Sequence, residues 1–344
     1  MALPPAVAAC RHGVRRSVAD LPPGQTVLVA CSGGPDSTAL AAAAVHEGRR
    51  AGLRVVGVTV DHGLQDGSAA RAEQVREQLL ALGCAEAYAV PVTVAAVGDG
   101  PEGAARRARY AALDRLADDL GAACVLVGHT RDDQAETVLL GLARGSGPRA
   151  VAGMAAQRGR VRRPLLDVPR VDTLAACAAA GLETWHDPHN DDPAFARVRV
   201  RRHLLPALEA QLGPGVADAL ARTAGLVRED AEALDALARA AYDRLQVPAG
   251  PTAAAGAGGR ACRDPAVGLA VAELLEQPRA VATRVLRLAA VDAGAIDGEL
   301  SHVHVRALWD LATGEVRGEV QLPGHLSARR DGGAIRLTRT DVPS

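Results

Sequence analysis

Short apolar runs alternate with helical segments through the first half of the chain, and this alternation constrains the fold more than any other feature. Each run is rich in Val, Ala or Leu, and a stretch with helical spacing of its apolar residues follows it. The expected strands are 27–30, 53–60, 87–94 and 124–127, and the expected helices are 37–47, 68–82, 102–120 and a segment that ends at 142. Regular strand–helix alternation predicts an α/β fold, with a parallel sheet covered by helices on both faces.

The middle of the chain departs from this pattern. Residues 144–161 are rich in Gly, Pro and Arg and are expected to form a mobile loop. A helix is predicted over 171–180, and a long Ala- and Leu-rich helix over 216–245. Residues 247–260 have the composition of a loop.

The last hundred residues predict two helices and then short strands near 319–322 and 334–338. We therefore expect an α/β domain over 1–212, a linker helix over 213–246 and a smaller α+β domain over 247–344.

The composition limits the partners that this chain can have. It has 344 residues, of which 48% are hydrophobic but only 2% aromatic, so its core must be built mainly from Ala, Val and Leu. All 39 Lys and Arg residues are arginine, and the net charge of −1 gives no global basic field that would attract nucleic acid. A polyanion would therefore have to bind a local cluster of arginines.

The six cysteines are scattered without a CxxC spacing, which indicates reduced thiols rather than a disulfide framework or a zinc site. The N-terminal apolar stretch is too short for a signal peptide, and no segment has the length and hydropathy of a membrane span. These features predict a soluble, cytoplasmic protein.

A glycine-rich turn, SGGPDS at residues 32–37, directly follows the first expected strand. Its glycines let backbone amides approach an anion, its serines add hydroxyl donors, and the next helix presents its positive end. Asp36 stands in a loop that would more often carry a lysine, and a carboxylate approaches phosphate comfortably only through a hard cation such as Mg²⁺. The alternative is a plain strand–helix connection in which Ser32 or Asp36 caps the helix.

Two further motifs follow expected strands. Asp61 opens DHGL at the end of the second strand, where the adenosine half of a nucleotide should lie, although an ordinary turn is the alternative. Asp133 and Glu136 lie three residues apart in GHTRDDQAET and therefore share a helix face, with His129 one turn earlier. Such a group can hold an ammonium and take its proton, but acids are also common at solvated helix starts.

Arginines cluster over 158–163 and over 197–202, and the helix over 102–120 carries further arginines. Arg106 and Arg109 are about one turn apart in the helix over 102–120, so at least one of them can point into a cleft.

In the second cluster Arg197, Arg199 and Arg201 alternate, which in an extended segment places them on one side and Arg202 on the other. Guanidinium clusters of this kind suit phosphate groups, and a merely solvated surface is the alternative.

Taken together, SGGPDS, DHGL, E-x-A-x-R-x-x-R-Y, GHTRDDQAET, RPLL and WHDPHNDDPAFARVRVRRHLLP resemble, in order and spacing, the bacterial tRNA(Ile)-lysidine synthetases of the PP-loop (N-type ATP pyrophosphatase) superfamily. The resemblance is strongest over residues 26–210. One departure is Val198, where the family commonly has Asn after the first arginine, so no amide contact is carried over to this position.

The resemblance implies a Rossmann-like parallel-sheet PP-loop domain with a smaller C-terminal α+β domain joined by a long helix. It implies an enzyme that uses ATP and Mg²⁺ to join free L-lysine to C2 of the wobble cytidine in the CAU anticodon of tRNA(Ile). The C2 oxygen is adenylated with release of pyrophosphate, and the lysine amine then expels AMP to give lysidine. A homodimer is one possible assembly.

The resemblance also implies roles for individual residues. The catalytic set is Asp36, Arg109, His129, Asp133, Glu136 and Arg201. The ATP-binding set is Ser32, Gly33, Gly34, Pro35, Asp36, Ser37 and Asp61, with Asp36 also holding Mg²⁺. The tRNA-binding set is Arg163, Arg197, Arg199 and Arg202.

Three other functions remain open at this point. A tRNA thiolase of the same superfamily would need a reactive cysteine pair or an iron–sulfur site, and Cys31 beside the loop is the nearest thiol. A non-catalytic adenine-nucleotide sensor would need neither the acid pair nor the arginines. An amidotransferase-type synthetase would need a glutaminase domain, for which the chain has little room.

Overall fold

The computed structural model describes residues 3–63, 67–93, 100–145, 147–187, 191–247 and 267–340, without the side chains of 100–102. The chain forms two compact units, Met1–Arg228 and Glu229–Ser344. The boundary falls inside α10 (Val216–Leu245), which has the bounds predicted for the long helix. The division into three parts at 212 and 246 remains a prediction.

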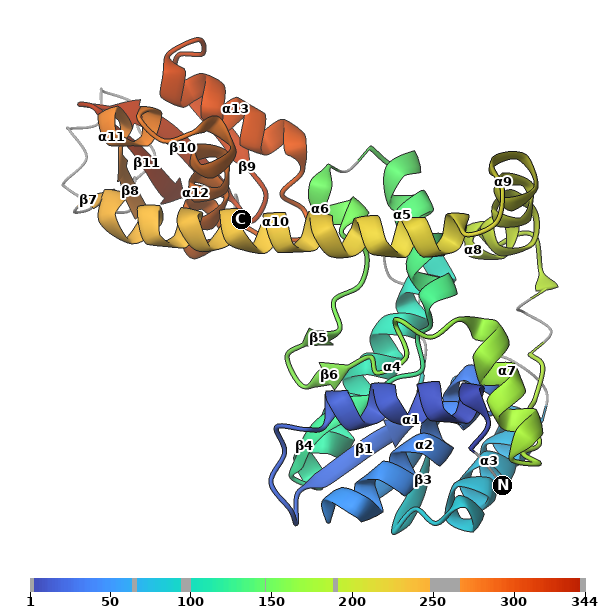
Figure 1. Cartoon of the computed structure of the whole chain (residues 1–344). Helices are drawn as coiled ribbons and strands as arrows, with labels where there is room; N and C mark the ends of the chain where they lie inside the picture. Colours follow the sequence, from blue (N-terminus) through green and yellow to red (C-terminus); the bar gives the residue numbers. More distant parts are fainter. Residues whose placement is uncertain are drawn as a thin grey trace. The chain divides into compact units, whose positions relative to one another are not determined.

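The first unit is built on a six-stranded sheet with the strand order β3-β2-β1-β4-β6-β5 (Figure 1). All neighbouring strands are parallel apart from the antiparallel pair β5 and β6. The strands are β1 (Thr26–Ala30), β2 (Arg54–Asp61), β3 (Glu86–Pro91), β4 (Ala122–Leu126), β5 (Gln157–Arg158) and β6 (Val161–Arg162). The predicted α/β fold with a mostly parallel sheet is confirmed.

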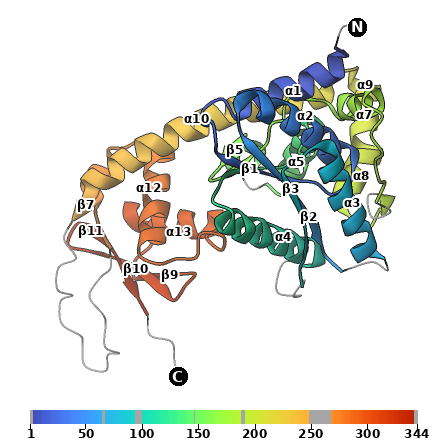
Figure 2. The same ribbon diagram turned by 90° about the horizontal axis from the view of Figure 1, so that it is seen from below.

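Helices cover both faces of this sheet, because alternate residues of its strands point to opposite sides. Val27 and Val29 of β1 belong to a core shared with α1, α2, α3 and α7, whereas Leu28 packs with Leu113 of α4 on the other face. Figure 2 shows α1 and α2 on one side of the strands and α4 on the other. These helices are α1 (Pro5–Ser17), α2 (Pro35–Ala51), α3 (Ser68–Leu82), α4 (Gly100–Asp119) and α7 (Arg170–Ala179).

The connection of the strands determines where a ligand can bind. β1 lies between β2 and β4. The chain therefore adds β2 and β3 on one side of β1 and then crosses over to add β4 on the other side. In open parallel sheets such a switch point leaves a crevice beyond the carboxyl ends of the strands. Three of the sequence motifs lie at this edge: the glycine-rich turn over 32–37 after β1, Asp61 at the end of β2 and His129 after β4.

The prediction of a mobile loop over 144–161 is wrong for most of that segment. It contains the short helix α6 (Pro148–Val151) and an antiparallel hairpin formed by β5 and β6. The strands of the hairpin have two residues each, which is too short for a periodic pattern to be visible in the sequence. Ser146 lies outside the described residues.

The arginine segment is helical, so its predicted extended geometry is wrong. It forms α8 (Ala196–Arg199), a π-helical turn (Val200–Leu204) and α9 (Leu205–Leu212). In a helix the residues four apart share a face, so Arg197 lies on the same face as Arg201 and not on the face of Arg199. The alternation of Arg and Val imitated the period of a strand.

The second unit has a five-stranded antiparallel sheet in the order β7-β8-β11-β10-β9. Its strands are β7 (Gln246–Val247), β8 (Val267–Ala270), β9 (Glu319–Leu322), β10 (Leu326–Asp331) and β11 (Ala334–Arg339), and its own helices are α11 (Val271–Leu275), α12 (Arg279–Asp292) and α13 (His302–Thr313). An aliphatic core that includes Leu269, Leu286, Leu308 and Ile335 joins sheet and helices. The predicted C-terminal α+β domain is confirmed, although the sequence predicts neither β7, β8 and β10 nor the short helix α11.

The last residue of the DHGL motif and the loop predicted over 247–260 cannot be compared with the structure, because residues 64 and 248–260 lie outside the described part of the chain. Within the described part, no helix combines the length and the hydropathy that a membrane crossing requires.

Candidate active site

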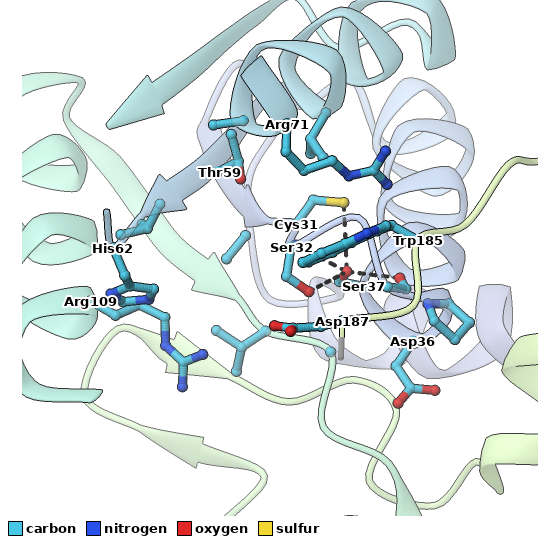
Figure 3. Close-up of a pocket in the computed structure, with 18 of the residues that line it drawn as sticks. Cys31, Ser32, Asp36, Ser37, Thr59, His62, Arg71, Arg109, Trp185 and Asp187 are labelled. Carbon is cyan, nitrogen blue, oxygen red and sulfur yellow. Dashed lines mark hydrogen bonds between the residues drawn. The ribbon is translucent and has the colours of Figure 1, made fainter. Parts of the chain in front are cut away.

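A cavity of about 810 Å³ opens at the carboxyl ends of β1, β2 and β4, within the size range of small-molecule sites. It is lined by eleven of the predicted site residues, Ser32, Gly34, Pro35, Asp36, Ser37, Asp61, Arg109, His129, Asp133, Arg201 and Arg202. Figure 3 shows the phosphate loop in the centre of this cavity, with His62 and Arg109 on one side and Asp36 on the other.

The phosphate loop (residues 32–37) is held by its own hydrogen bonds. Ser37 Oγ accepts from the Ser32 amide over 3.1 Å and donates to the Gly34 carbonyl over 2.9 Å. Gly33 has φ +82°, and a Cβ there would lie 2.8 Å from Val75 Cγ2, so only glycine fits. The Gly33 carbonyl accepts from the Trp185 amide over 2.8 Å. The turn is therefore organised before any ligand binds.

The N-terminus of α2 is available to an anion. Gly34 is its N-cap residue and Pro35 follows at the first helical position, and in the described chain no side chain caps this end of the helix. The first amides of a helix lack intrahelical acceptors and carry a partial positive charge. The alternative of a helix capped by Ser32 or Asp36 is thus not what the structure contains, and the amides can accept phosphate oxygens.

Asp36 is engaged by the first turn of α7. Its Oδ2 accepts from Arg170 Nε over 3.1 Å and its Oδ1 accepts from Thr173 Oγ1. Burial raises the pKa of Asp36, and Arg170 opposes that rise. Each carboxylate oxygen keeps a second lone pair, so Asp36 fits a cation that is bound by one carboxylate together with substrate phosphates, as Mg²⁺ commonly is.

The predicted acid pair lies at the start of α5 (Arg131–Ala143). Asp133 forms a capping box with Thr130: its Oδ2 accepts from the Thr130 amide over 2.8 Å, and Thr130 Oγ1 accepts from the Asp133 amide. Burial alone would raise the pKa of Asp133, but Arg170, His129 and the Thr130 amide outweigh it and hold the pKa at about 2. Asp133 is therefore an anion at neutral pH and a weak proton acceptor.

Glu136 is 0% exposed and is surrounded by arginines. Arg201 donates Nε to Oε1 over 2.6 Å and Nη2 to Oε2 over 3.1 Å, which is a bidentate pair. Arg197 Nε lies 3.8 Å from Oε2 and its Nη2 donates to Thr137 Oγ1 over 3.2 Å. The structure therefore places Arg197 beside the acid pair, and its assignment to tRNA stays a prediction.

The other predicted catalytic groups lie in the buried part of the cavity. Burial lowers the pKa of His129 to about 3, so its imidazole is neutral at pH 7. Burial also lowers the pKa of Arg109, which nevertheless stays charged as guanidiniums do in proteins. Arg109 lies beside His62 (Figure 3), and burial followed by this positive charge lowers the pKa of His62. A neutral ring and a half-buried cation thus line one wall.

The remaining arginines predicted to bind tRNA differ in exposure. Arg163 is 8% exposed and donates Nη1 to the Ala155 carbonyl over 2.8 Å, so its burial speaks against a direct phosphate contact. Arg199 donates to two backbone carbonyls of residues 193 and 194, and Arg202 pairs with Asp191. Arg199 and Arg202 are exposed, and their assignment to tRNA stays a prediction.

Four residues of this site were not identified from the sequence. Arg170 and Thr173 contact Asp36 as described; Arg170 directly precedes the helix predicted over 171–180 and Thr173 lies in it, but neither was assigned to the site. Arg71 lies with its Cζ 5.1 Å from the centroid of the Trp185 ring, over the phosphate loop. The aromatic residue at the start of WHDPHNDD was the only sequence signal for any of the four.

Comparison with known proteins agrees with this geometry. Residues 11–208, more than half of the chain, match the family described as the PP-loop domain. Fold, phosphate loop and cavity together define a PP-loop ATP-binding protein.

Several curated tRNA(Ile)-lysidine synthases are similar over nearly the whole chain. That of Thermobifida fusca is 54% identical over 334 residues, covering 96% of this chain and 97% of the relative. That of Streptomyces coelicolor is 53% identical, covering 92% and 86%, and that of Salinispora arenicola is 51% identical, covering 99% and 98%. The chain belongs to the tRNA(Ile)-lysidine synthase family.

A solved structure also shares the fold. The U34-tRNA thiolase NcsA from Methanococcus maripaludis, which is described with its [4Fe–4S] cluster, superposes with a TM-score of 0.55 at 17% identity. The match covers 65% of this chain and 80% of that chain. At this identity the likeness concerns the architecture alone.

Proposed function

We propose that this protein, an ATP-dependent ligase of the tRNA(Ile)-lysidine synthase family, joins free lysine to C2 of the wobble cytidine in a CAU-anticodon tRNA(Ile). One observation carries the proposal: a single cavity is lined both by the phosphate loop and by Asp133, with Glu136 directly behind it. A nucleotide and an amine could therefore meet there.

The nucleotide half of the site is the phosphate loop. Its amides and the N-terminus of α2 would hold the phosphates, while Asp61 at the end of β2 lies where the nucleoside should extend. The C2 oxygen of cytidine attacks the α-phosphorus and pyrophosphate leaves, and the loop amides stabilise the departing charge. Asp36 would hold Mg²⁺, which when bound neutralises charge on the phosphate oxygens.

The amine half of the site is the acid pair. Lysine arrives as an ammonium, and Asp133 and Glu136 are the buried carboxylates that could bind it. The ammonium passes its proton to Glu136 or to water, the neutral amine attacks C2 and forms a C–N bond, and the C–O bond breaks so that AMP leaves. Because the pKa of Asp133 is about 2, this residue suits binding of the cation better than removal of its proton.

The third group to be held is the cytosine. It must leave its stack in the anticodon loop to reach the cavity, which costs less in a loop than in a duplex. Arg109 and the neutral His129 line the buried wall and can orient the base and its activated oxygen. Exposed Arg202 at the rim is the candidate for contact with the tRNA backbone.

The thiolase alternative requires a reactive sulfur, and the described cysteines do not offer one. Five cysteines are buried and free. Burial raises the pKa of Cys10 and Cys124 to about 11 and that of Cys84 and Cys177 to about 12, which leaves little thiolate at neutral pH. Cys31 lies 3.6 Å from Ser37 Oγ, as part of the loop's packing.

The test is ligation of labelled lysine by the purified protein with ATP, Mg²⁺ and unmodified tRNA(Ile) carrying CAU. We expect label on the tRNA that disappears without ATP, with EDTA, or in Asp36→Asn. Asp167→Asn is a matched control, because that side chain is 79% exposed and pairs only weakly with Arg16 outside the cavity. Incorporation of sulfur, or ATP binding without pyrophosphate release, would contradict the proposal.

The proposal also covers where the protein acts in the cell and its oligomeric state. We propose that the protein acts in the cytoplasm, where ATP, lysine and tRNA occur together, which fractionation of cells would test. A homodimer stays a prediction, and sedimentation equilibrium of the full chain decides it.

A further inference from the structure

Arg170, the first residue of α7, reaches carboxylates on two other helices. Its Nε donates to Asp36 Oδ2 over 3.1 Å, its Nη2 to Asp133 Oδ1 over 2.8 Å and its Nη1 to Glu136 Oε1 over 3.4 Å. The side chain is 19% exposed and lines the cavity. One guanidinium thus connects the carboxylate at the phosphate loop with the two carboxylates of the amine half.

The acid pair has few free acceptors in this arrangement. A carboxylate oxygen offers two lone pairs. Asp133 Oδ2 accepts from the amide and the hydroxyl of Thr130, and Asp133 Oδ1 accepts from Arg170 and Arg201. Glu136 Oε1 accepts from the same two arginines. Among the described residues, Glu136 Oε2 accepts only from Arg201, so it alone keeps a free lone pair. An ammonium brings three donors and must therefore displace a guanidinium to place more than one of them on the acid pair.

The two guanidiniums are not held equally. Arg201 forms a bidentate pair with Glu136, with contacts of 2.6 and 3.1 Å. Arg170 gives each carboxylate a single N–H, and its contact with Glu136 is the longest of the three at 3.4 Å. Its Nε already donates to Asp36 of the phosphate loop, so phosphate oxygens bound to that loop would compete for this guanidinium.

We propose that Arg170 is a positioning residue that couples the two halves of the site. In the nucleotide-free protein it occupies Asp133 and Glu136, and when phosphate binds it turns toward that charge and frees the acid pair for the ammonium of lysine. This inference rests on the proposed function. Bound nucleotide then raises the affinity for lysine, and by thermodynamic linkage lysine raises the affinity for nucleotide by the same factor.

The coupling can be measured as lysine binding by equilibrium dialysis of the full chain with labelled lysine and Mg²⁺. The two arms lack or contain an ATP analogue with a methylene group between the α and β phosphorus atoms. For the wild type we expect lysine to bind at least about tenfold more tightly with the analogue, within the usual range of coupling between sites.

Arg170→Lys is the informative variant. It keeps the charge, so the three carboxylates stay compensated and the fold should survive. An ammonium is a compact charge that cannot contact three carboxylates in the fixed geometry of a guanidinium. We expect lysine to bind the free variant more tightly than the free wild type, and the effect of the analogue to shrink to about threefold or less.

Arg197→Lys is the matched control: Arg197 Nε lies 3.8 Å from Oε2 of the same Glu136, and within the described part of the chain Arg197 has no hydrogen bond or ion pair with Asp36. It should keep the full effect of the analogue. An unchanged effect in Arg170→Lys overturns the coupling, as does absence of lysine binding in both arms of a wild type that still labels tRNA. Absence of both binding and tRNA labelling overturns the proposed function itself.

Discussion

Adjacent glycines of the phosphate loop should respond differently to the same substitution. Gly34 has φ −74° and ψ 161°, which alanine adopts freely, and an added Cβ would lie 3.6 Å from Ser32 Oγ and 3.9 Å from the Trp185 carbonyl oxygen. Loss of glycine's freedom in the unfolded chain favours alanine by about 0.4–1 kcal/mol, and the poorer N-cap costs a similar amount. The stability of Gly34→Ala should therefore stay within about 1 kcal/mol of the wild type.

Nucleotide binding should nevertheless weaken in Gly34→Ala. The new methyl group stands at the mouth of the loop, where phosphate must approach the amides closely. Loss of one hydrogen bond to a charged oxygen costs about 1.5–3 kcal/mol, which corresponds to roughly 10- to 150-fold weaker binding. Calorimetric titration with the non-cleavable ATP analogue measures this change, and thermal unfolding of the same sample measures stability.

Gly33→Ala is the contrasting variant, because its φ of +82° and the 2.8 Å approach to Val75 Cγ2 strain the folded protein itself. A left-handed non-glycine residue costs about 1–3 kcal/mol, so the melting temperature should fall by roughly 2–12 °C in a unit of this size. Equal ATP affinity in Gly34→Ala and the wild type would refute the idea that these amides hold the phosphates.

Three further predictions concern charge. Asp133→Asn should keep ATP–pyrophosphate exchange but lose lysine transfer to tRNA, and unaltered transfer would remove this residue from the amine half. Burial holds the pKa of His129 at about 3 in the folded protein, below its ordinary value of 6.5, so the unfolded chain binds an extra proton and stability falls as pH drops from 6.5 toward 3. Between pH 6.5 and pH 5 the unfolding free energy of the wild type should therefore fall by about 1.5 kcal/mol more than that of His129→Gln, as measured by urea titrations at the two pH values. An equal fall in both proteins would contradict this. Arg202→Gln should reduce the slope of log K against log [salt] for tRNA binding by about one, as measured by salt titrations. Arg163→Gln should mainly lower the melting temperature, because the side chain of Arg163 is buried. The reverse pattern would exchange the roles of the two residues.

The parts of the site that follow from local chain geometry could be predicted from the sequence. A glycine-rich turn between a strand and a helix determines where the amides point, so the loop over 32–37 was located correctly. Asp133 and Glu136 share a face in any helix, and their common position at the end of β4 follows from the parallel sheet. Local rules of this kind involve residues within one or two turns of each other.

Contacts that depend on distant packing could not be predicted. Arg170 is 134 residues from Asp36 in the sequence, and an arginine after a proline at a helix start resembles a solvent-exposed residue. Arg163 directly follows a hairpin too short to leave a pattern; it is buried and donates to the Ala155 carbonyl before that hairpin. The Arg–Val alternation has the period of a strand, yet tertiary contacts make the segment helical, with Val198 and Val200 both buried.

The π-helical turn at Val200–Leu204 stores one residue more than a regular helix needs over the same span. A single-residue deletion there should close the bulge into an ordinary turn, while Arg197 before it and Leu205 after it keep their packing. The side chains within the turn would rotate, and Arg201 would lose its contact with Glu136. In this chain, deletion of one residue from this turn could therefore remove an arginine contact from the amine half of the site while the helices on either side stay packed.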